Sequence, residues 1–548
     1  MKKFIRTVSI TLSVLTSLSA CAINASAVIN PFNLERATGG LPSSSTPTID
    51  VNENLSSSSS PLALPDSVDL SESECFPEVG DQGIISSCTA WATTYYQFGY
   101  QVAAMNSWNA KNDPTKQFSP KWTYNLINEG KDEGSAITSA YRVLSSQGAV
   151  RYSEFTPNSF DESISEFTEW YLDKDGMKQA LQYRVSEYKH LSFARSTADT
   201  PIISSKSGCL TIMKSLLNSG KVLTFDTDIT EWDYEKLTNQ YDTSLNKQYV
   251  CIKQINVDDV DDWHAMTIVG YDDNITYDLN GDGVIQAYEK GAFKIVNSWG
   301  TDYCNDGFVW VMYDALNKVS NAENQNVSTR RPILKDYAYY FIDVQEYPLD
   351  LIAEVTLTQS YRNEIKVGLA QSDYDTTIGS DYTDTILRRA GGAFNFSGLG
   401  TIPMTTTFVF DYGSLCSSQI VRQNFYVKVT DFVEKNYTTI NNIKLIDKTG
   451  KIVANDTVND SIDNIQAKAY RYTIGMVGDV NNDAKIDTQD ITDIQNYLAG
   501  GIEFSDEDIL VADVDGSGGV DITDVMYLQY YIAGIYDTFE NGHFVKLN

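Results

Sequence analysis

Near its C-terminal end the chain reads GDVNNDAKIDTQDITDIQNYLAG over residues 478–500 and returns to the same pattern, ADVDGSGGVDITDVMYLQYYIAG, over residues 512–534. Each copy opens with a loop in which oxygen-bearing side chains alternate with other residues, and an apolar stretch of helix length follows the loop. Ca²⁺ takes about six to eight oxygen ligands, and a loop of about 12 residues with this spacing supplies them. The repeat therefore predicts two calcium loops, each followed by a helix (491–498 and 525–532).

The predicted ligands occupy loop positions 1, 3, 5, 7 and 12, where position 7 contributes a backbone carbonyl. They are Asp479, Asn481, Asp483, Lys485 and Asp490 in the first copy, and Asp513, Asp515, Ser517, Gly519 and Asp524 in the second. Both loops end in Asp, whereas an EF-hand loop ends in Glu. Ala484 stands where such loops usually have Gly, so the first loop is expected to bind Ca²⁺ more weakly than the second.

The duplicated loop–helix pattern resembles a type I dockerin over residues 475–536. The resemblance implies a small helical Ca²⁺-binding domain that attaches the protein to a cohesin of a scaffoldin, within a cell-surface cellulosome. It also implies that loop positions 10 and 11 contact the cohesin. These positions hold Thr488 and Gln489 in the first copy, and Ile522 and Thr523 in the second. Because the copies differ there, the two binding faces are expected to be unequal.

The N-terminal sequence, MKKFIRTVSITLSVLTSLSACAINASA (1–27), has the basic start, apolar centre and small-residue end of a secretory signal. A rival reading is a lipobox ending at Cys21, which would leave a lipid-anchored protein. No later stretch contains the roughly 20 apolar residues that a transmembrane helix needs. The net charge of −32 argues against a nucleic-acid partner. We therefore expect a secreted, extracellular protein.

The chain is too long for one hydrophobic core, so several domains are expected. Residues 28–64 are rich in Ser, Pro and Asn and predict a flexible leader. Residues 350–470 alternate apolar and polar residues between turn signals, which predicts a β-sandwich-like domain. Residues 65–345 mix helical and strand patterns, including helix-like spacing over 86–104. Beyond the signal six cysteines remain, and their pairing cannot be derived from the sequence.

Three motifs within 65–345 carry the candidate chemistry. They are GDQGIISSCTAWA (80–92), WHAMTIVGY (263–271) and FKIVNSWG (293–300). Their order and content resemble the papain-like (C1 family) cysteine peptidases over residues 65–320. The resemblance implies an α+β fold with a helical half and a β-rich half, followed here by the all-β domain and the dockerin. It also implies an enzyme that hydrolyses peptide bonds in protein or peptide substrates.

The roles implied by the resemblance fall on five residues. Cys88 would be the nucleophile, His264 the base and Asn297 the residue that orients it. Gln82 would donate to the oxyanion, and Trp299 would shield the Asn–His hydrogen bond from water. The reactive form of a cysteine is the thiolate, and a helix N-terminus together with an imidazolium lowers the thiol pKa. Because Cys88 stands where a helix is predicted to begin, a thiolate–imidazolium pair is expected.

The match has departures. Ile85 and Thr89 replace the Cys and Trp that many family members have there, so a usual family disulfide is missing. The distance from Cys88 to His264 exceeds the roughly 130–150 residues typical of the family, which predicts insertions within 155–210 and 230–262. Gly134 and Ser135 align weakly with the family residues that pair with the substrate backbone.

A third loop, Asp278-Leu-Asn-Gly-Asp-Gly-Val-Ile-Gln-Ala-Tyr-Glu289, lies between the His and Asn motifs and fits the EF-hand calcium pattern. Its predicted ligands are Asp278, Asn280, Asp282 and Glu289. Because strands rather than helices are predicted on both sides, a polar hairpin without metal stays open as the alternative.

Two other functions stay open at this point. One is a catalytically inactive papain-fold binding module. The other is a dockerin-bearing adhesion protein whose 350–470 domain binds carbohydrate. The presence of Gln82, Cys88, His264 and Asn297 together favours the enzyme, because a binding module does not need all four. The 350–470 domain contains no Trp, the residue most often used to stack against sugars.

Overall fold

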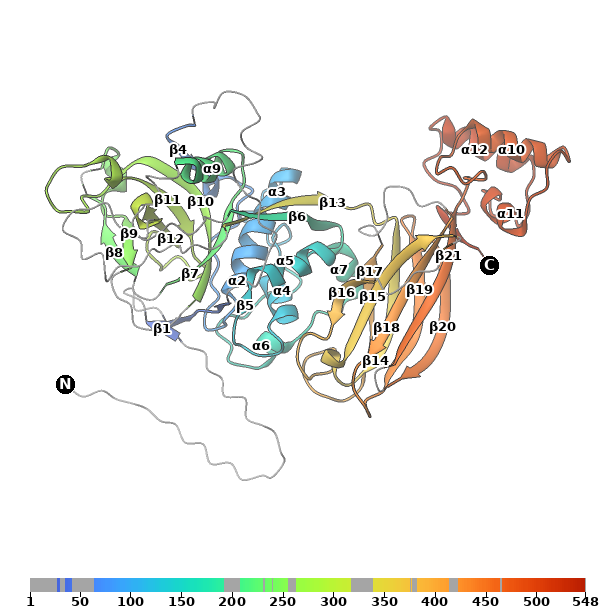
Figure 1. The fold of residues 1–548 in the computed structure, drawn as a ribbon, viewed down its shortest axis with the longest axis horizontal. Coiled ribbons are helices and arrows are strands. Elements are labelled where there is room, and N and C mark those ends of the chain that lie inside the picture. The colour runs from blue at the N-terminus through green and yellow to red at the C-terminus, as the bar shows by residue number, and fades with distance from the viewer. Residues whose placement is uncertain are drawn as a thin grey trace.

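The fold is taken from a computed structural model (Figure 1). The structure describes residues 27–29, 35–41, 64–191, 207–229, 232–238, 240–254, 263–316, 339–374, 376, 382–412, 422–463 and 466–547. Cys21 and all of the predicted secretory signal except Ala27 lie within residues 1–26, outside the described residues. Within the described part of the chain, no helix combines the length and apolar character needed to cross a bilayer.

The first half of the chain contains a group of helices. They are α2 (Cys88–Ala90), a π-helical stretch (Trp91–Phe98), α3 (Gly99–Asn106), α4 (Pro120–Ile127), α5 (Ile137–Ser146), α6 (Ser165–Thr168), α7 (Lys174–Ala180) and, later in the chain, α9 (Ser207–Asn218). The predicted helix over 86–104 corresponds to the continuous run from α2 to α3. Local signals explain some boundaries: Ser119 accepts a hydrogen bond from the Trp122 amide, and Pro120 occupies the first turn of α4.

A nine-stranded sheet adjoins these helices. Its strands, in order along the sheet, are β6 (Tyr183–Leu191), β13 (Tyr339–Glu346), β7 (Leu223–Asp228), β10 (Trp263–Thr276), β11 (Lys290–Val296), β12 (Phe308–Met312), β9 (Tyr249–Gln254) and β8 (Trp232–Lys236), with β4 (Ser67–Asp69) paired to β10. The central strand β10 is buried over most of its first half, and it pairs with β7 on one side and β11 on the other. Short 3₁₀ turns cover 70–72, 243–245, 287–289 and 313–316.

Residues 351–476 are β-rich, as predicted for 350–470. One sheet contains β17 (Met404–Asp411), β14 (Leu351–Gln359), β19 (Thr438–Asp447) and β20 (Ile452–Ile462). The other contains β16 (Thr383–Arg388), β15 (Ile365–Asp373), β18 (Gln423–Asp431), β21 (Ala467–Met476) and β22 (Phe544–Lys546). Side chains of both sheets, such as Val355 and Val427, belong to one buried cluster. We call this two-sheet unit the β module.

The β module shares a core with the helices. Figure 1 shows helices α2 to α7 between the nine-stranded sheet and the β module. The same buried cluster that fills the β module includes Trp122 and Leu144 of α4 and α5. Gln147 donates to the Val409 carbonyl at 2.8 Å, and Arg362 donates to the Thr168 carbonyl at 2.6 Å. The two parts are therefore joined by a buried, hydrogen-bonded interface.

The C-terminal helices α10 (Thr488–Leu498), α11 (Asp506–Ala512) and α12 (Ile522–Ile532) form a small separate core around Ile494, Val514 and Leu528. The chain then returns as β22, which pairs with β21 and completes a sheet of the β module. Arg422 also forms an ion pair with Asp508 at 2.7 Å. The small domain is thus attached to the β module at both ends.

Four cysteines have described side chains: Cys75, Cys88, Cys251 and Cys304. Cys209 and Cys416 fall where no side chain is described. Among the described cysteines no disulfide forms, so this part of the fold is held by packing and hydrogen bonds.

Candidate active site and calcium loops

Cys88 is the first residue of α2, and its side chain is fully buried. The helix continues without interruption through Asn106, so the backbone amides of its first turn point toward the Cys88 end. The Cys88 Sγ accepts a hydrogen bond from the Ala265 amide at 3.4 Å. The thiol therefore lies against β10, at the residue that follows His264.

His264 and Asn297 meet across two neighbouring strands. His264 lies at the start of β10, and Asn297 directly follows β11. Their side chains form a hydrogen bond of 2.7 Å between His264 Nε2 and Asn297 Oδ1. The Trp299 ring lies 4.7 Å from the imidazole, centroid to centroid, and all three side chains are fully buried. His264 Nδ1 makes no hydrogen bond with any described residue, so it is available to a reacting group.

Gln82 is fixed beside this group. Its backbone amide donates to the Ser298 carbonyl at 2.8 Å, and its side-chain Oε1 accepts from the Ser298 hydroxyl at 2.7 Å. Its Nε2 donates to the carbonyls of Ile85 at 2.9 Å and of Ala37 at 3.0 Å. The amide is therefore oriented by the Asn-Ser-Trp-Gly motif, and it points at a carbonyl oxygen supplied by the N-terminal segment.

Residues 35–41, which we call the cleft segment, lie over the site. They belong to the region predicted to be a flexible leader. Gly39 donates to the Trp263 carbonyl at 3.0 Å and accepts from the Ser135 amide at 2.8 Å. The strand β3 (Gly40–Leu41) pairs in parallel with β5 (Ser135–Ala136), and upstream β2 (Glu35–Ala37) pairs with β1 (Ala27–Ile29). The backbone position predicted to hold substrate thus holds a piece of this chain.

Gly134 shows how closely the two backbones approach. Its φ is +86°, and a Cβ there would lie 2.3 Å from the Gly39 carbonyl oxygen. A larger residue would push the cleft segment away from Ser135. Gly134 and Ser135 are therefore brought to the site together with Gln82, Cys88, His264, Asn297 and Trp299.

In the covered site, Cys88 and His264 are both expected in their neutral forms at pH 7. Burial raises the pKa of the Cys88 thiol to about 12, and hydrogen bonds from Ala265 and Thr89 offset this only in part. Burial lowers the pKa of His264 to about 4, although the Asn297 hydrogen bond acts in the opposite direction. The expected thiolate–imidazolium pair is absent from this state, because a closed, dry site disfavours both charges.

Sequence reasoning missed the residues that cover the site. Ala37 and Gly39 make its backbone contacts, and Arg36 pairs with Asp81 at its edge. A signal was present: ATGG (37–40) is a run of small residues inside an otherwise polar leader, as required for close backbone approach.

The two C-terminal loops share one hydrogen-bond pattern. The position-1 carboxylate accepts from the amides of positions 5 and 6, and the position-12 carboxylate accepts from those of positions 2, 3 and 9. These bonds involve Asp479 and Asp490 in the first loop, and Asp513 and Asp524 in the second. Each loop therefore folds around its own centre, and the two loops fold in the same way.

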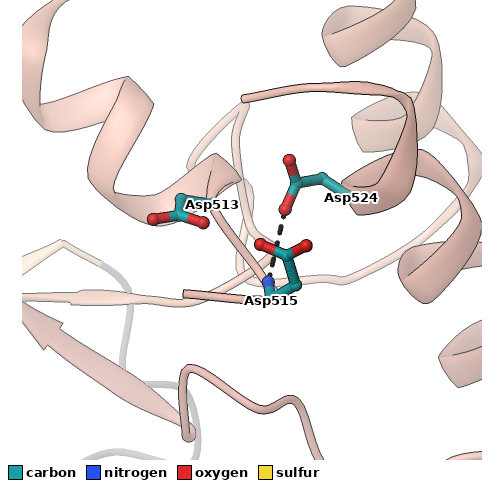
Figure 2. Close-up of side chains that lie close together, drawn as sticks. All are labelled: Asp513, Asp515 and Asp524. Atoms are coloured by element: carbon teal, nitrogen blue, oxygen red, sulfur yellow. Dashed lines mark hydrogen bonds between the residues drawn. The ribbon is translucent and has the colours of Figure 1, made fainter. Parts of the chain in front are cut away.

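The second loop gathers its carboxylates most closely. One oxygen from each of Asp513, Asp515 and Asp524 lies within 4.8 Å of the others (Figure 2). Burial raises the pKa of Asp524, and in the first loop burial with two neighbouring carboxylates raises that of Asp479 to about 6. Converging buried carboxylates fit a hard cation such as Ca²⁺, which would favour their charged forms.

Ala484 has a strained backbone conformation, whereas Gly518, at the same position of the second loop, does not. Its φ is +69°, and Gly518 at the same position of the second loop has φ +92°. A residue with a Cβ is strained by about 1–2 kcal/mol in this left-handed region, whereas Gly is not. This is a physical reason to expect the first loop to be the weaker site.

The loop from Asp278 to Glu289 has the same pattern. Asp278 accepts from the amides of Gly281, Asp282 and Gly283. Glu289, which is buried, accepts from those of Leu279, Asn280 and Gln286. Strands β10 and β11 flank this loop, as the sequence predicted.

The predicted cohesin-contacting residues lie at the starts of α10 and α12, where Thr488, Gln489 and Ile522 are exposed and Thr523 is half-buried. Ile522 is 68% exposed, and Met526, one turn later, is 40% exposed. The corresponding residues of the first copy, Thr488 and Thr492, are exposed and polar. The two copies therefore present chemically different faces.

The family model for the type I dockerin domain matches residues 477–533, which confirms the predicted dockerin. The solved structures that the chain resembles are papain-like cysteine proteases. Xylellain from Xylella fastidiosa is 20% identical over 56% of this chain and 95% of its own, with a TM-score of 0.33. Procathepsin L 3 from the Tenebrio molitor larval midgut is 16% identical over 52% of this chain and 72% of its own, with a TM-score of 0.33. Bromelain from Ananas comosus, solved with the E64 inhibitor, is 13% identical over 51% of this chain and 99% of its own, with a TM-score of 0.31. A search of curated proteins finds no match.

Proposed function

We propose that this protein is a secreted cysteine endopeptidase that its dockerin attaches to a cohesin of a cell-surface scaffoldin. One observation carries the enzymatic part: Cys88 begins a helix, and its Sγ accepts from the amide of Ala265, which follows His264 of the buried His264–Asn297 pair joined at 2.7 Å. The match at residues 477–533 supports the docking part.

The site supports acyl transfer through a thioester. Once a substrate replaces the cleft segment, Cys88 gives its proton to His264 and attacks the scissile carbonyl carbon. The Gln82 amide and the Cys88 backbone N–H donate to the oxyanion, where each donor is worth about 3 kcal/mol. His264 then protonates the leaving amine, and water releases the acyl group. Asn297 keeps the imidazole in place throughout, and Trp299 covers their hydrogen bond.

Ala37 supports the assignment of the oxyanion position. Its carbonyl oxygen accepts from Gln82 Nε2 at 3.0 Å, as the carbonyl oxygen of a bound peptide would. The cleft segment thereby marks the path of a polypeptide across the nucleophile.

The test is titration of the purified protein with an epoxide inhibitor directed at active-site thiols, followed by mass spectrometry. We expect a single adduct on Cys88 that forms in step with loss of peptidase activity. An adduct on Cys75 instead, with Cys88 unmodified in protein that cleaves peptides, would overturn the proposed nucleophile.

We further propose that the Asp278–Glu289 loop binds Ca²⁺ and stiffens the strands that carry His264 and Asn297. Binding to the folded state alone stabilises it by RT ln(1 + [L]/Kd), about 2.7 kcal/mol at a hundredfold excess over Kd. We expect Ca²⁺ to raise the melting midpoint reported by Trp fluorescence, and the Asp278→Asn variant, which changes the position where the pattern requires Asp, to lose most of this increase. All eight Trp residues lie between positions 91 and 310, so this signal does not report directly on the dockerin.

The matched control for the Ca²⁺ experiment is Asp302→Asn, which removes an equal charge from an exposed site outside the loop. It should keep the full Ca²⁺ response. A midpoint that Ca²⁺ and chelator leave unchanged in the wild-type protein would instead indicate a polar hairpin without metal.

The dockerin is proposed to fold and bind its cohesin only with Ca²⁺, and mainly through the α12 face. Replacing Ile522-Thr523 by Thr-Gln should weaken cohesin binding by at least about tenfold, because it removes an exposed apolar contact. Replacing Thr488-Gln489 by Ala-Ala should cost much less. Titration calorimetry at saturating Ca²⁺ measures both, and equal losses would refute the unequal faces without affecting the dockerin assignment.

A further inference from the structure

We propose that Asp81 and Phe160 form a subsite that receives a basic side chain, preferably Arg, of the peptide substrate. This inference rests on the proposed peptidase function and names a substrate class for it. The starting observation is that the subsite is filled in this structure by Arg36, a residue of the cleft segment.

The contact with Arg36 has the geometry of specific guanidinium recognition. Arg36 Nε donates to Asp81 Oδ1 at 2.8 Å, and Nη2 donates to Asp81 Oδ2 at 2.7 Å. The guanidinium carbon lies 4.9 Å from the centre of the Phe160 ring. The side chains of Arg36 and Asp81 are 13% and 27% exposed, so the pair is largely shielded from water. Two parallel hydrogen bonds and an aromatic face suit Arg better than Lys.

The carboxylate is held in place by the peptidase rather than by Arg36. Asp81 forms a backbone bridge with Trp299, and its Oδ1 accepts from the Gly83 amide at 2.9 Å. Gly300 lies so close that a Cβ there would be 2.7 Å from Asp81 Oδ2. Because these contacts remain when the cleft segment leaves, the acceptor is already oriented for another basic side chain.

The subsite is adjacent to the reacting carbonyl position. Arg36 is the neighbour of Ala37, whose carbonyl oxygen accepts from the oxyanion donor Gln82. On the other side of Ala37, the cleft segment runs through Gly39 to Ser135. A substrate side chain at Asp81 therefore belongs to a residue within about one or two positions of the scissile bond, on the side away from Ser135.

Space continues beyond Asp81. A surface cavity of about 500 Å³ is lined by residues that include Glu78, Asp81, Tyr152 and Phe160. The cavity lining contains one cationic residue, Lys111, and two acidic residues, Glu78 and Asp81. The cavity leaves room for a long side chain and for the chain that follows it.

The experiment uses full-length protein carrying Arg36→Ala, so that the chain's own side chain does not fill the subsite. A panel of otherwise neutral peptides places Arg, Lys, Gln or Glu at each position around the scissile bond, and kcat/KM is measured for each. We expect one position, on the side away from Ser135, to favour Arg over Gln by about tenfold, with Lys between them. Mass spectrometry of the products locates the cleaved bond.

Three variants in the Arg36→Ala background identify the subsite. Asp81→Asn should bring the Arg:Gln ratio of kcat/KM close to one, and Asp81→Lys should make Glu the preferred residue. Phe160→Leu should lower the Arg:Gln ratio in part, because it removes the aromatic face and leaves the Asp81 carboxylate in place. The control Asp302→Asn should leave the ratio unchanged.

The outcomes distinguish failure of the proposed subsite from failure of the proposed peptidase function. If peptides are cleaved without a preference for Arg, or if the preference survives Asp81→Asn, the subsite is overturned and the peptidase stands. If no variant cleaves any peptide and the epoxide does not modify Cys88, the proposed function is overturned, and the subsite with it.

Discussion

Replacing Cys88 by Ala is expected to abolish peptide hydrolysis, with a loss of about 10⁶-fold in kcat, the scale seen when one member of a catalytic unit is removed. The reason is that Cys88 supplies the only described thiol beside the His264–Asn297 pair. Without it no thioester forms, and Gln82 has no tetrahedral intermediate to stabilise. The measurement is hydrolysis of a casein-like protein and of a fluorogenic peptide by full-length protein.

The neighbouring residues should give graded losses. His264→Ala should approach the Cys88→Ala loss, because residues that act as one unit contribute non-additively. Asn297→Ala should be milder, about 10²-fold, because Asn297 orients the imidazole and transfers no proton.

The matched control is Cys75→Ala, which removes another free, partly exposed thiol and leaves the Gln82–Asn297 group untouched. It should retain wild-type activity. Cys88→Ala should still bind cohesin, since the dockerin has its own core. Wild-type hydrolysis by Cys88→Ala would show that the proposed nucleophile is wrong.

Charge at the site depends on whether the cleft segment is in place. With it in place, pH 7 lies below the thiol pKa of about 12 and above the His264 pKa of about 4, so both groups are neutral. Entry of water and substrate would weaken the burial that causes both shifts. We therefore expect displacement of residues 35–41 to be the step that allows a thiolate–imidazolium pair to form.

The sequence was sufficient where the information is local. The ligands of a calcium loop are all within 12 residues, so their spacing alone predicts that Asp479 and Asp490, or Asp513 and Asp524, face one centre. The Gln, Cys, His and Asn motifs are far apart in sequence, and it was the family resemblance, not their spacing, that predicted their meeting.

Two features depended on contacts that no local pattern encodes. The cleft segment has too few residues for a periodicity, and its partners, Gln82, Ser135 and Trp263, are distant in sequence. The interface with the β module was missed for the same reason. It contains buried charges, Arg184 and Arg362, which a sequence-based reading assigns to the surface.

Replacing Asp411 by Ala is expected to destabilise the joined peptidase and β module by about 3–5 kcal/mol, the usual cost of leaving one buried charge without its partner. Asp411 ends β17 of the β module, and it forms an ion pair with Arg184 at the start of β6. Both side chains are fully buried. The guanidinium also lies 3.7 Å from the centre of the Tyr347 ring.

The Asp411 prediction is measured as the melting midpoint by Trp fluorescence. All eight Trp residues lie between positions 91 and 310, and one of them, Trp170, packs against Phe408 of the β module, so the signal reports on the helices, the nine-stranded sheet and the interface. A fall of several degrees in the Trp midpoint would show that the β module stabilises the peptidase fold.

The double variant Arg184→Met/Asp411→Leu is the control, because apolar side chains of similar size remove both charges together and often restore stability. The surface pair Lys546–Asp456, broken by Asp456→Ala, should cost less than about 1 kcal/mol. If Asp411→Ala left the Trp transition unchanged while the β module unfolded separately, the two parts would be independent domains, and the shared core would not couple them.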